Sequence, residues 1–219
     1  MKKGIFITFE GPEGGGKSTQ IQYLADALRS QGHPVVLTRE PGGTRLAKVL
    51  RKLLLHTNNV PLSPLAELLL YEADRAQHVE ECILPGLKRR QVVLCDRYFD
   101  STTAYQGYGR GLPLSLIHTL NRIASRGRKP DLTILLDVSV RRGLRLAAAS
   151  KNGKDRLEAA GMAFHRRVRR GFLRLAAKEP RRFRIVKQRK NPMETQWRIQ
   201  QAVGEYLKKS FSLKRRRWP

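Results

Sequence analysis

A glycine-rich segment near the N-terminus has the residues and the spacing that bind the phosphates of a nucleoside triphosphate. It reads Gly11-Pro12-Glu13-Gly14-Gly15-Gly16-Lys17-Ser18-Thr19 and matches G-x-x-x-x-G-K-[ST]. Its glycines let backbone N–H groups curl around phosphate oxygens, and the helix expected after it adds a positive N-terminal end. We expect Lys17 to contact the β- and γ-phosphates and the Ser18 hydroxyl to bind Mg²⁺.

An acidic and a basic residue follow an apolar run farther along the chain. Val92 to Cys95 reads as a buried strand, and Asp96 and Arg97 come directly after it. Ligands of open α/β sheets bind at this end of the strands, so Asp96 is a candidate to hold Mg²⁺ or its water. Arg97 can direct a fork of donors at a phosphate. The alternative is that the two side chains only pair with each other or cap a helix.

Other segments offer groups for a second substrate. Arg39 to Thr44 follows a predicted strand, and Tyr71, Asp74, Arg75 and His78 recur at three- and four-residue spacing, which puts them on one helix face. A ring beside an arginine suits a nucleobase attached to a phosphate. Aromatic residues at this spacing more often belong to a core, and His78 is expected to be a core or surface histidine.

The elements that position these residues alternate between strands and helices. Apolar β-branched runs at 5–9, 35–38, 92–95, 132–136 and 183–186 predict five strands. Helices are predicted after the glycine-rich loop up to Gly32, and at 46–55, 65–84, 159–177 and 194–207. Ser63 before Pro64 is expected to cap the helix 65–84, and Pro85-Gly86 to end it. This order predicts an α/β fold with a five-stranded parallel sheet between helices.

Composition excludes several classes of protein and leaves one open. No window approaches the ~18 consecutive apolar residues of a membrane span, and the N-terminus does not read as a signal peptide. Cys82 and Cys95 have no metal-ligand spacing and are expected to be reduced thiols of a cytoplasmic protein. The net charge is +26: residues 1–110 carry 15 Lys and Arg against 11 Asp and Glu, and residues 111–219 carry 29 against 7. This asymmetry keeps a nucleic-acid-binding P-loop ATPase as an alternative.

The ordered set of segments resembles the bacterial thymidylate kinases over roughly residues 4 to 207. The glycine-rich loop is shared by many families, so the resemblance depends on the other segments. These are Thr38-Arg39-Glu40-Pro41-Gly42-Gly43-Thr44, residues 68–79, Asp96-Arg97-Tyr98 through Tyr105-Gln106-Gly107, Pro130-Asp131-Leu132, Leu135-Leu136-Asp137-Val138 and Asp155-Arg156-Leu157-Glu158.

The resemblance implies transfer of the ATP γ-phosphoryl group to dTMP, with Mg²⁺, by a homodimer of a three-layer P-loop fold. Arg39, Arg75 and Arg97 would then surround the dTMP phosphate, and Tyr71 would stack on thymine. The family also implies polar groups at the base edge and sugar, which here are Ser101, Thr102 and Gln106 at the base, Tyr105 at the sugar 2′ position, and Glu13 at the 3′-hydroxyl. A kinase for another pyrimidine monophosphate, such as dUMP, is the alternative within this class.

A mobile lid over the phosphates is where the chain departs from the family pattern. Some members carry a catalytic arginine inside the glycine-rich loop, at the position that Gly14 occupies here. Members without it use an arginine-rich lid, which corresponds to residues 143–156. We therefore expect Arg156 to be the principal lid cation, supported by Lys151 or Lys154; the alternative is that Arg156 braces the lid hinge by pairing with Asp155 or Glu158.

We expect one domain, residues 1–208, followed by a mobile basic tail, residues 209–219. Its partners are expected to be ATP, dTMP and a second copy of the chain, and neither a membrane nor a specific nucleic-acid sequence. Positioning and electrostatics, rather than a nucleophilic side chain, would provide catalysis.

Overall fold

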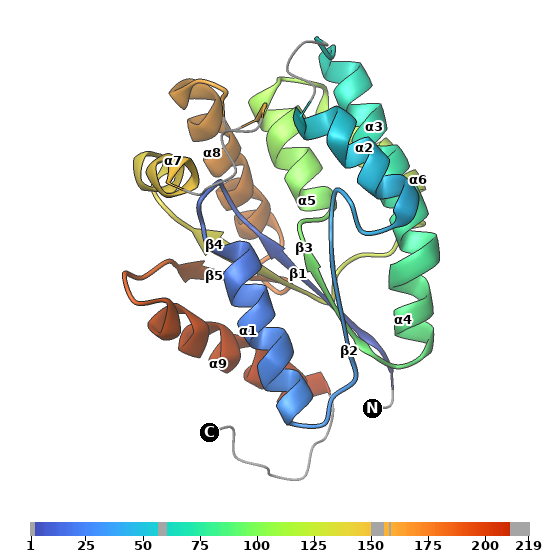
Figure 1. The fold of residues 1–219 in the computed structure, drawn as a ribbon, viewed down its shortest axis with the longest axis vertical. Helices are drawn as coiled ribbons and strands as arrows, with labels where there is room; N and C mark the ends of the chain where they lie inside the picture. The colour runs from blue at the N-terminus through green and yellow to red at the C-terminus, as the bar shows by residue number, and fades with distance from the viewer. Residues whose placement is uncertain (1–2, 57–60, 150–155, 158, 211–219) are drawn as a thin grey trace.

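The five predicted runs form the strands of one parallel sheet in the middle of the fold (Figure 1). The computed structural model describes residues 3–210 apart from 57–60, 150–155 and 158. The strands are β1 Ile5–Glu10, β2 Val35–Arg39, β3 Val92–Asp96, β4 Leu132–Asp137 and β5 Phe183–Lys187. They pair in the order β2-β3-β1-β4-β5, and every neighbouring pair is parallel. The predicted fold class is confirmed.

Helices cover both faces of the sheet. On one face, α1 Lys17–Ser30 and α9 Pro192–Ser210 pack on an apolar cluster that includes Ile7, Leu24 and Val203. On the other face, α3 Pro64–His78, the π-helical η2 Thr103–Gly109 and α8 Met162–Lys178 surround Tyr105 and Phe172. The remaining helical elements are α2 Arg45–His56, η1 Val79–Ile83, α4 Leu84–Lys88, α5 Phe99–Thr102, α6 Leu114–Ala124 and α7 Val140–Ala148.

The central strand, β1, is buried along its whole length because both faces and both edges are covered. Ile5, Ile7 and Phe9 join the cluster under α1 and α9, whereas Phe6 packs on the opposite face against Val93. This alternation is the two-residue period of a strand, and it explains why β1 reads as an unbroken apolar run. No helix in the described ranges is long and apolar enough to cross a membrane.

Three helix boundaries differ from the sequence predictions. Ser63 caps α3 as predicted, accepting a hydrogen bond from the Ala66 N–H, but Pro85-Gly86 does not end the helical run. The π-helical turn η1 starts a new register, and Pro85 then lies in the first turn of α4, where an N–H is not needed. Helix α8 begins at Met162 rather than 159, because Gly161 is its N-cap. Helix α9 continues through Ser210, two residues past the predicted domain end at 208, and residues 211–219 lie outside the described ranges.

Candidate active site

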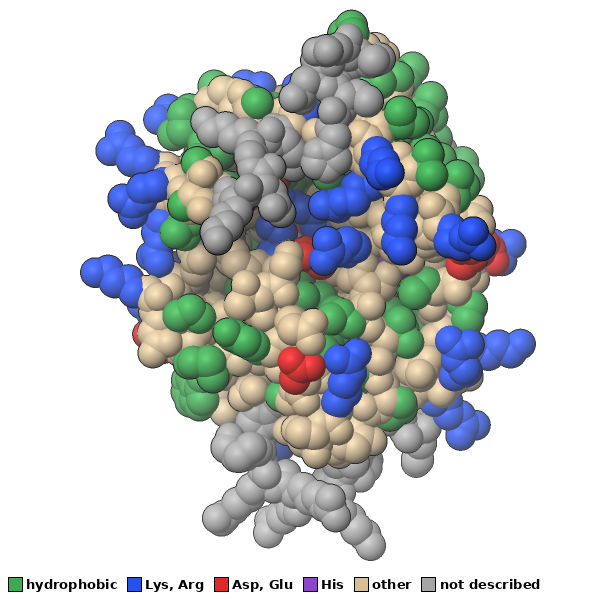
Figure 2. Space-filling model, viewed as in Figure 1, with side chains coloured by type: hydrophobic (Ala, Val, Ile, Leu, Met, Phe, Trp, Pro, Cys, Tyr) green, Lys and Arg blue, Asp and Glu red, His purple; other side chains and the backbone are tan. Residues whose placement is uncertain are grey.

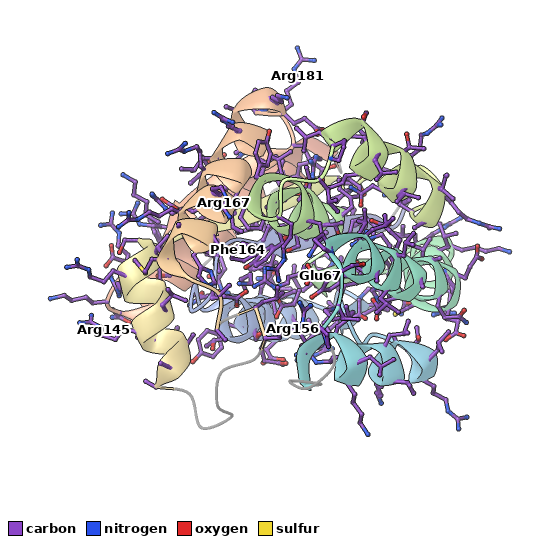
Figure 3. All side chains as sticks on the ribbon, turned by 90° about the horizontal axis from the view of Figure 1, so that it is seen from above. Glu67, Arg145, Arg156, Phe164, Arg167 and Arg181 are labelled. Carbon is purple, nitrogen blue, oxygen red and sulfur yellow. The ribbon has the colours of Figure 1, made fainter. Side chains whose placement is uncertain are left out.

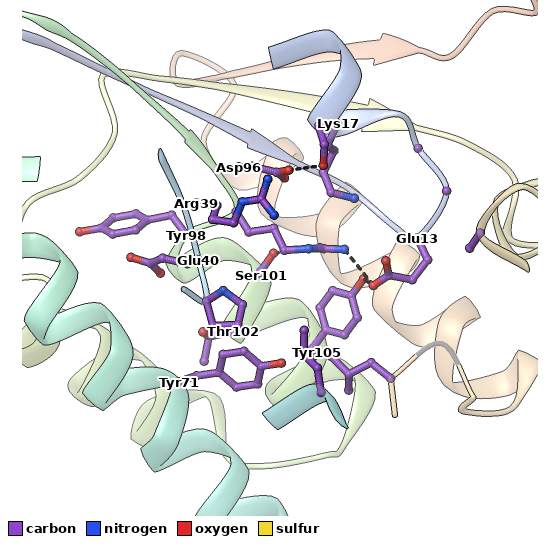
Figure 4. A pocket seen from close by; sticks show the side chains of 18 of the residues that line it. Glu13, Lys17, Arg39, Glu40, Tyr71, Asp96, Tyr98, Ser101, Thr102 and Tyr105 are labelled. Atoms are coloured by element: carbon purple, nitrogen blue, oxygen red, sulfur yellow. Dashed lines mark hydrogen bonds and ion pairs between the residues drawn. The ribbon is translucent and has the colours of Figure 1, made fainter. Parts of the chain in front are cut away.

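A cavity of about 780 Å³ opens at the carboxyl edge of the sheet, where β2 and β3 end beside the loop that follows β1 (Figure 4). The phosphate loop from Glu13 to Thr19 forms one side of the cavity. The lining also includes Asp96, the predicted magnesium ligand, and the side chains predicted for the second substrate: Arg39, Tyr71, Arg75, Arg97, Ser101, Thr102, Tyr105 and Gln106, with Glu13 on the loop. Among the described residues, Gly11, Pro12 and Arg156 are predicted site residues that do not line it.

The phosphate loop has the backbone shape that its glycines make accessible. Gly14 and Gly16 have positive φ angles of 64° and 77°, and Gly16 is the N-cap of α1. The Lys17 ammonium lies inside the loop and donates to the carbonyls of Gly11 and Pro12, at 3.1 and 2.8 Å. Burial and the nearby Arg97 charge lower the pKa of Lys17 to about 8. A bound triphosphate would raise this pKa again, because negative charge favours the ammonium form.

Ser18 and Asp96 meet between α1 and β3. The Ser18 hydroxyl donates to Oδ2 of Asp96 at 2.6 Å, which brings the two predicted magnesium ligands together. A hydroxyl and one carboxylate are oxygen donors that fit Mg²⁺, which is commonly held by few protein ligands together with phosphates and waters. The described residues hold no cluster of three or more His, Cys, Asp or Glu side chains that could hold a metal ion.

Arg97 is the centre of a polar network that faces the phosphate loop. Its backbone has a φ of 72°, which is uncommon for a residue with a side chain. The guanidinium pairs with Glu13 at 2.8 Å and donates to Ser101 at 3.1 Å, and it lies 5.1 Å from the centre of the Tyr105 ring. The alternative that Arg97 pairs with Asp96 is therefore not what the structure shows.

Glu13 is fixed from two sides, because the Tyr105 hydroxyl also donates to its carboxylate, at 2.6 Å. Burial acts to raise the pKa of Glu13, but the charges of Arg97 and Lys17 outweigh it and lower this pKa to about 2. The carboxylate is therefore ionised throughout the physiological range and can accept a hydrogen bond from a substrate hydroxyl.

Arg75 lies deeper in the wall of the cavity than the other two predicted phosphate-binding arginines. It is 1% exposed and donates four hydrogen bonds of 2.8–3.0 Å, to Glu40, Glu72, Asn121 and Thr102. A guanidinium has five N–H groups, so Arg75 has little donor capacity left for a substrate. Arg39 is exposed at the rim of the cavity.

Two buried carboxylates that sequence reasoning missed support these arginines. Glu40 accepts from Arg75 and from Nδ1 of His78, at 3.0 and 2.9 Å, which confirms His78 as a core histidine. Glu10 accepts from the N–H of Tyr98 at 2.7 Å and from Ser101 at 2.6 Å, and so fixes both sides of Arg97. Burial, with the nearby Asp100 charge, raises the pKa of Glu10 to about 8. The sequence offered one signal for these two acids: Glu10 is the last residue of β1 and Glu40 directly follows β2, which places both at the edge of the sheet where ligands bind.

Arg156 is bound outside the cavity. Its Nη1 pairs with the buried carboxylate of Glu67 on α3, and its Nε donates to the Leu54 carbonyl at the end of α2, at 3.0 Å (Figure 3). Glu67 also accepts from Gln106 at 2.7 Å and from Arg110 at 3.1 Å. Glu67 therefore connects the end of the lid to a residue of the cavity wall. The other predicted lid residues, Lys151, Lys154 and Asp155, lie outside the described ranges, as does Glu158.

The lid helix α7 packs directly on the phosphate loop through two glycines. A Cβ added at Gly14 would lie 1.9 Å from the carbonyl oxygen of Gly143, and one added at Gly143 would lie 2.3 Å from that of Glu13. A side chain at either position would require the two backbones to separate. This contact explains why position 14 holds glycine and why the loop offers no cation beyond Lys17.

Comparisons with known proteins agree with this geometry. The family model described as thymidylate kinase matches residues 9–199. The thymidylate kinase of Desulfovibrio desulfuricans is 48% identical over 94% of this chain and 97% of its own, and that of Geotalea uraniireducens is 50% identical over 91% and 96%. The crystal structure of thymidylate kinase from Ehrlichia chaffeensis superposes with a TM-score of 0.75 at 36% identity, covering 91% of this chain and 98% of that one. The chain belongs to the thymidylate kinase family.

Proposed function

We propose that this enzyme transfers the γ-phosphoryl group of ATP to dTMP and so produces dTDP and ADP for DNA synthesis. The observation that carries the proposal is one cavity that joins a phosphate loop to a wall with Arg97, Tyr71 and polar side chains. An oxygen of the dTMP phosphate attacks the γ-phosphorus, and the bond to the β,γ-bridging oxygen breaks. Mg²⁺, held by Ser18 and Asp96, would neutralise phosphate charge when bound.

One side of the cavity binds ATP and the other side binds dTMP. The phosphate loop and Lys17 hold the ATP phosphates, and Arg39 and Arg97 hold the dTMP phosphate, with Arg75 contributing its remaining donor capacity. Tyr71 stacks on thymine, and Ser101, Thr102 and Gln106 face the base edge. Tyr105 excludes a ribose 2′-hydroxyl, and Glu13 accepts from the 3′-hydroxyl. Catalysis then consists of alignment and stabilisation of the charge that develops on the transferring group.

The phosphate loop supplies one cation, Lys17, which contacts the β- and γ-phosphates. The lid must therefore supply the further positive charge that the transferring phosphoryl group needs. We propose Arg156 for this role, with Lys151 or Lys154 in support. In the structure the Arg156 guanidinium is held by Glu67, so it must leave this carboxylate to reach the transferring phosphoryl group.

We infer a cytoplasmic location, where ATP and deoxynucleotides are available. Both cysteines are free thiols, Cys95 buried and Cys82 half-buried, as is usual in a reducing compartment.

We expect dTMP to be the best acceptor. If the base side of the cavity contacts the thymine methyl, dTMP should be favoured over dUMP by about 10–200-fold in kcat/KM, as is typical for one methyl group. UMP and CMP should be poorer still, because Tyr105 crowds the ribose. Coupled assays of ADP release with dTMP, dUMP, UMP and CMP measure this order. A higher kcat/KM for UMP, CMP or dUMP than for dTMP would contradict the assignment.

We also propose that the enzyme is a homodimer that buries an apolar face of α2 and α3. Leu46, Val49, Leu65 and Leu69 are about half exposed, and hydrophobic side chains gather along the upper right edge of the molecule, where these helices lie (Figure 2). Such a continuous apolar face is typical of a subunit interface. Light scattering should give twice the chain mass for the wild type. The variant Val49→Asp should be monomeric, whereas Lys88→Asp, on α4, should stay dimeric.

A further inference from the structure

The outer surfaces of α7 and α8 carry positive charge with no acidic residue among them. The two helices pack against each other, and Figure 3 shows both at the same side of the fold. Every charged residue of α8 is Arg or Lys, and the same is true of α7. The set comprises Arg141, Arg142, Arg145, Arg166, Arg167, Arg169, Arg170, Arg174 and Lys178. We call it the α7–α8 basic surface.

Among the residues that the structure describes, the acids nearest to α7 and α8 in sequence are already paired. Asp137 at the end of β4 pairs with Arg169 at 2.7 Å, and Glu179 after α8 pairs with Arg182 at 3.1 Å. None of the described acidic side chains forms an ion pair with Arg166, Arg170 or Lys178, which are exposed. Apart from Arg169, which Asp137 neutralises, the basic surface therefore keeps its charge with respect to the described residues.

This arrangement opposes the stability of the helix that carries it. Arg166, Arg170, Arg174 and Lys178 follow one another at four-residue spacing, and like charges at this spacing repel. Helix α8 forms because its opposite face, with Phe164, Val168 and Phe172, is buried in the core. An anionic partner along the outer face would relieve the repulsion.

The shape of the surface indicates what kind of anion fits it. From Arg166 to Lys178 the row spans about 18 Å at 1.5 Å per residue, so it suits an extended chain of charges. Arginine predominates, and its planar fork matches phosphate oxygens. The exposed residues of α8 that are not basic are Met162, Ala163 and Ala177. Leu173 lies on the same side but is half-buried against the core, so α8 exposes no leucine or aromatic side chain of the kind that anchors a helix in a lipid surface.

We propose that the α7–α8 basic surface binds the phosphate backbone of nucleic acid without sequence preference, independently of the kinase reaction. Basic side chains release counterions from the backbone on binding, so affinity should fall steeply with salt. The surface lies outside the residues that line the catalytic cavity, except that Leu146 and Ala147 of α7 reach it. Binding can therefore be removed without touching the proposed substrate contacts.

The test compares two full-length variants that lose the same charge. One is Arg166→Gln, Arg170→Gln, Lys178→Gln; the matched control is Lys52→Gln, Lys88→Gln, Arg122→Gln, exposed residues of α2, α4 and α6. Fluorescence anisotropy with a labelled mixed-sequence duplex of about 30 base pairs gives the affinity at several salt concentrations. Kinase activity of each variant reports that it is folded, because none of the six residues belongs to the proposed site.

The first variant should bind about 100-fold more weakly at 0.15 M salt, with a log–log salt slope shallower by about 3, and keep normal kinase activity. The control variant should bind like the wild type. Equal weakening of both variants would overturn the proposal in favour of net charge alone. Loss of binding on deletion of residues 211–219, with no effect of the α8 changes, would assign binding to the tail. Equally tight, α8-dependent capture by anionic vesicles would show a lipid partner instead.

Discussion

Replacing Arg156 by alanine is expected to lower kcat about 10²–10³-fold with little change in KM. The expectation follows from the loss of one donor that acts on charge present mainly in the transition state. Arginine contacts two oxygens at once, which a lysine ammonium does less well, so Lys151→Ala and Lys154→Ala should lose distinctly less. Steady-state kinetics with saturating ATP and dTMP measure all three. A nearly normal Arg156→Ala enzyme beside a crippled lysine variant would contradict the assignment.

The ion pair between Arg156 and Glu67 allows a control experiment for the alternative that Arg156 has only a structural role. If Arg156 only braces the lid hinge, then Glu67→Gln should reproduce the kcat loss of Arg156→Ala, and the double variant should lose no more. If Arg156 acts on the phosphoryl group, Glu67→Gln should retain most of kcat, because it removes the charge that holds the arginine away. Urea unfolding of each variant separates the stability cost of the lost ion pair from the kinetic effect.

Substituting arginine for Gly14 is expected to destabilise the protein by about 2–5 kcal/mol and to remove most of its activity. A side chain in the left-handed region costs roughly 1–2 kcal/mol, and forcing atoms into a packed contact typically costs about 1–3 kcal/mol. The φ of Gly14 is 64°, and its Cβ would lie 1.9 Å from the Gly143 carbonyl oxygen. Relief of this clash would displace the loop that positions Lys17. Urea unfolding and kcat/KM measure the two effects.

Two matched alanine variants separate the causes. Gly32 has a φ of 79° and nothing within 4 Å of its added Cβ, so Gly32→Ala should show the backbone cost alone. Gly143 is helical, and its Cβ would meet the Glu13 carbonyl oxygen, so Gly143→Ala should show the steric cost, offset in part by the higher helix propensity of alanine. Gly14→Ala should exceed both. A stable, active Gly14→Arg enzyme would show that α7 moves away from the loop at little cost.

The strands and the phosphate side of the site could be predicted because their signals are local. Each predicted strand matches the structure to within one residue at its C-terminal end, since buried parallel strands read as continuous apolar runs. The glycines and Lys17 are adjacent in sequence, and Tyr71 and Arg75 share a helix face, so their proximity follows from helix geometry. Both reach the cavity, as predicted.

The supporting carboxylates could not be predicted, because a charged side chain is expected at the surface unless its partner is known. Glu67 is 1% exposed, and its partner Arg156 comes from a distant segment that only the tertiary fold brings near. Glu10 is likewise buried by contacts with residues that follow β3. Pro85-Gly86 wrongly predicted the end of the helical run. The π-helical turn η1 precedes it, so Pro85 lies in the first turn of a new helix, where its missing N–H breaks no hydrogen bond.

Because β1 lies between β3 and β4 in the sheet, it cannot complete its pairing until both later strands have been synthesised. β1 leaves the ribosome first, yet its neighbours come much later, since Ile5 pairs with Val92 and Ile7 with Leu132. At synthesis rates of about 5–20 residues per second, β4 follows β1 by roughly 6–25 s. Throughout that interval a largely apolar strand has at least one open edge, which is a template for pairing with other chains. Until β4 is made, the strand that holds the phosphate loop in place therefore needs protection from pairing with other chains.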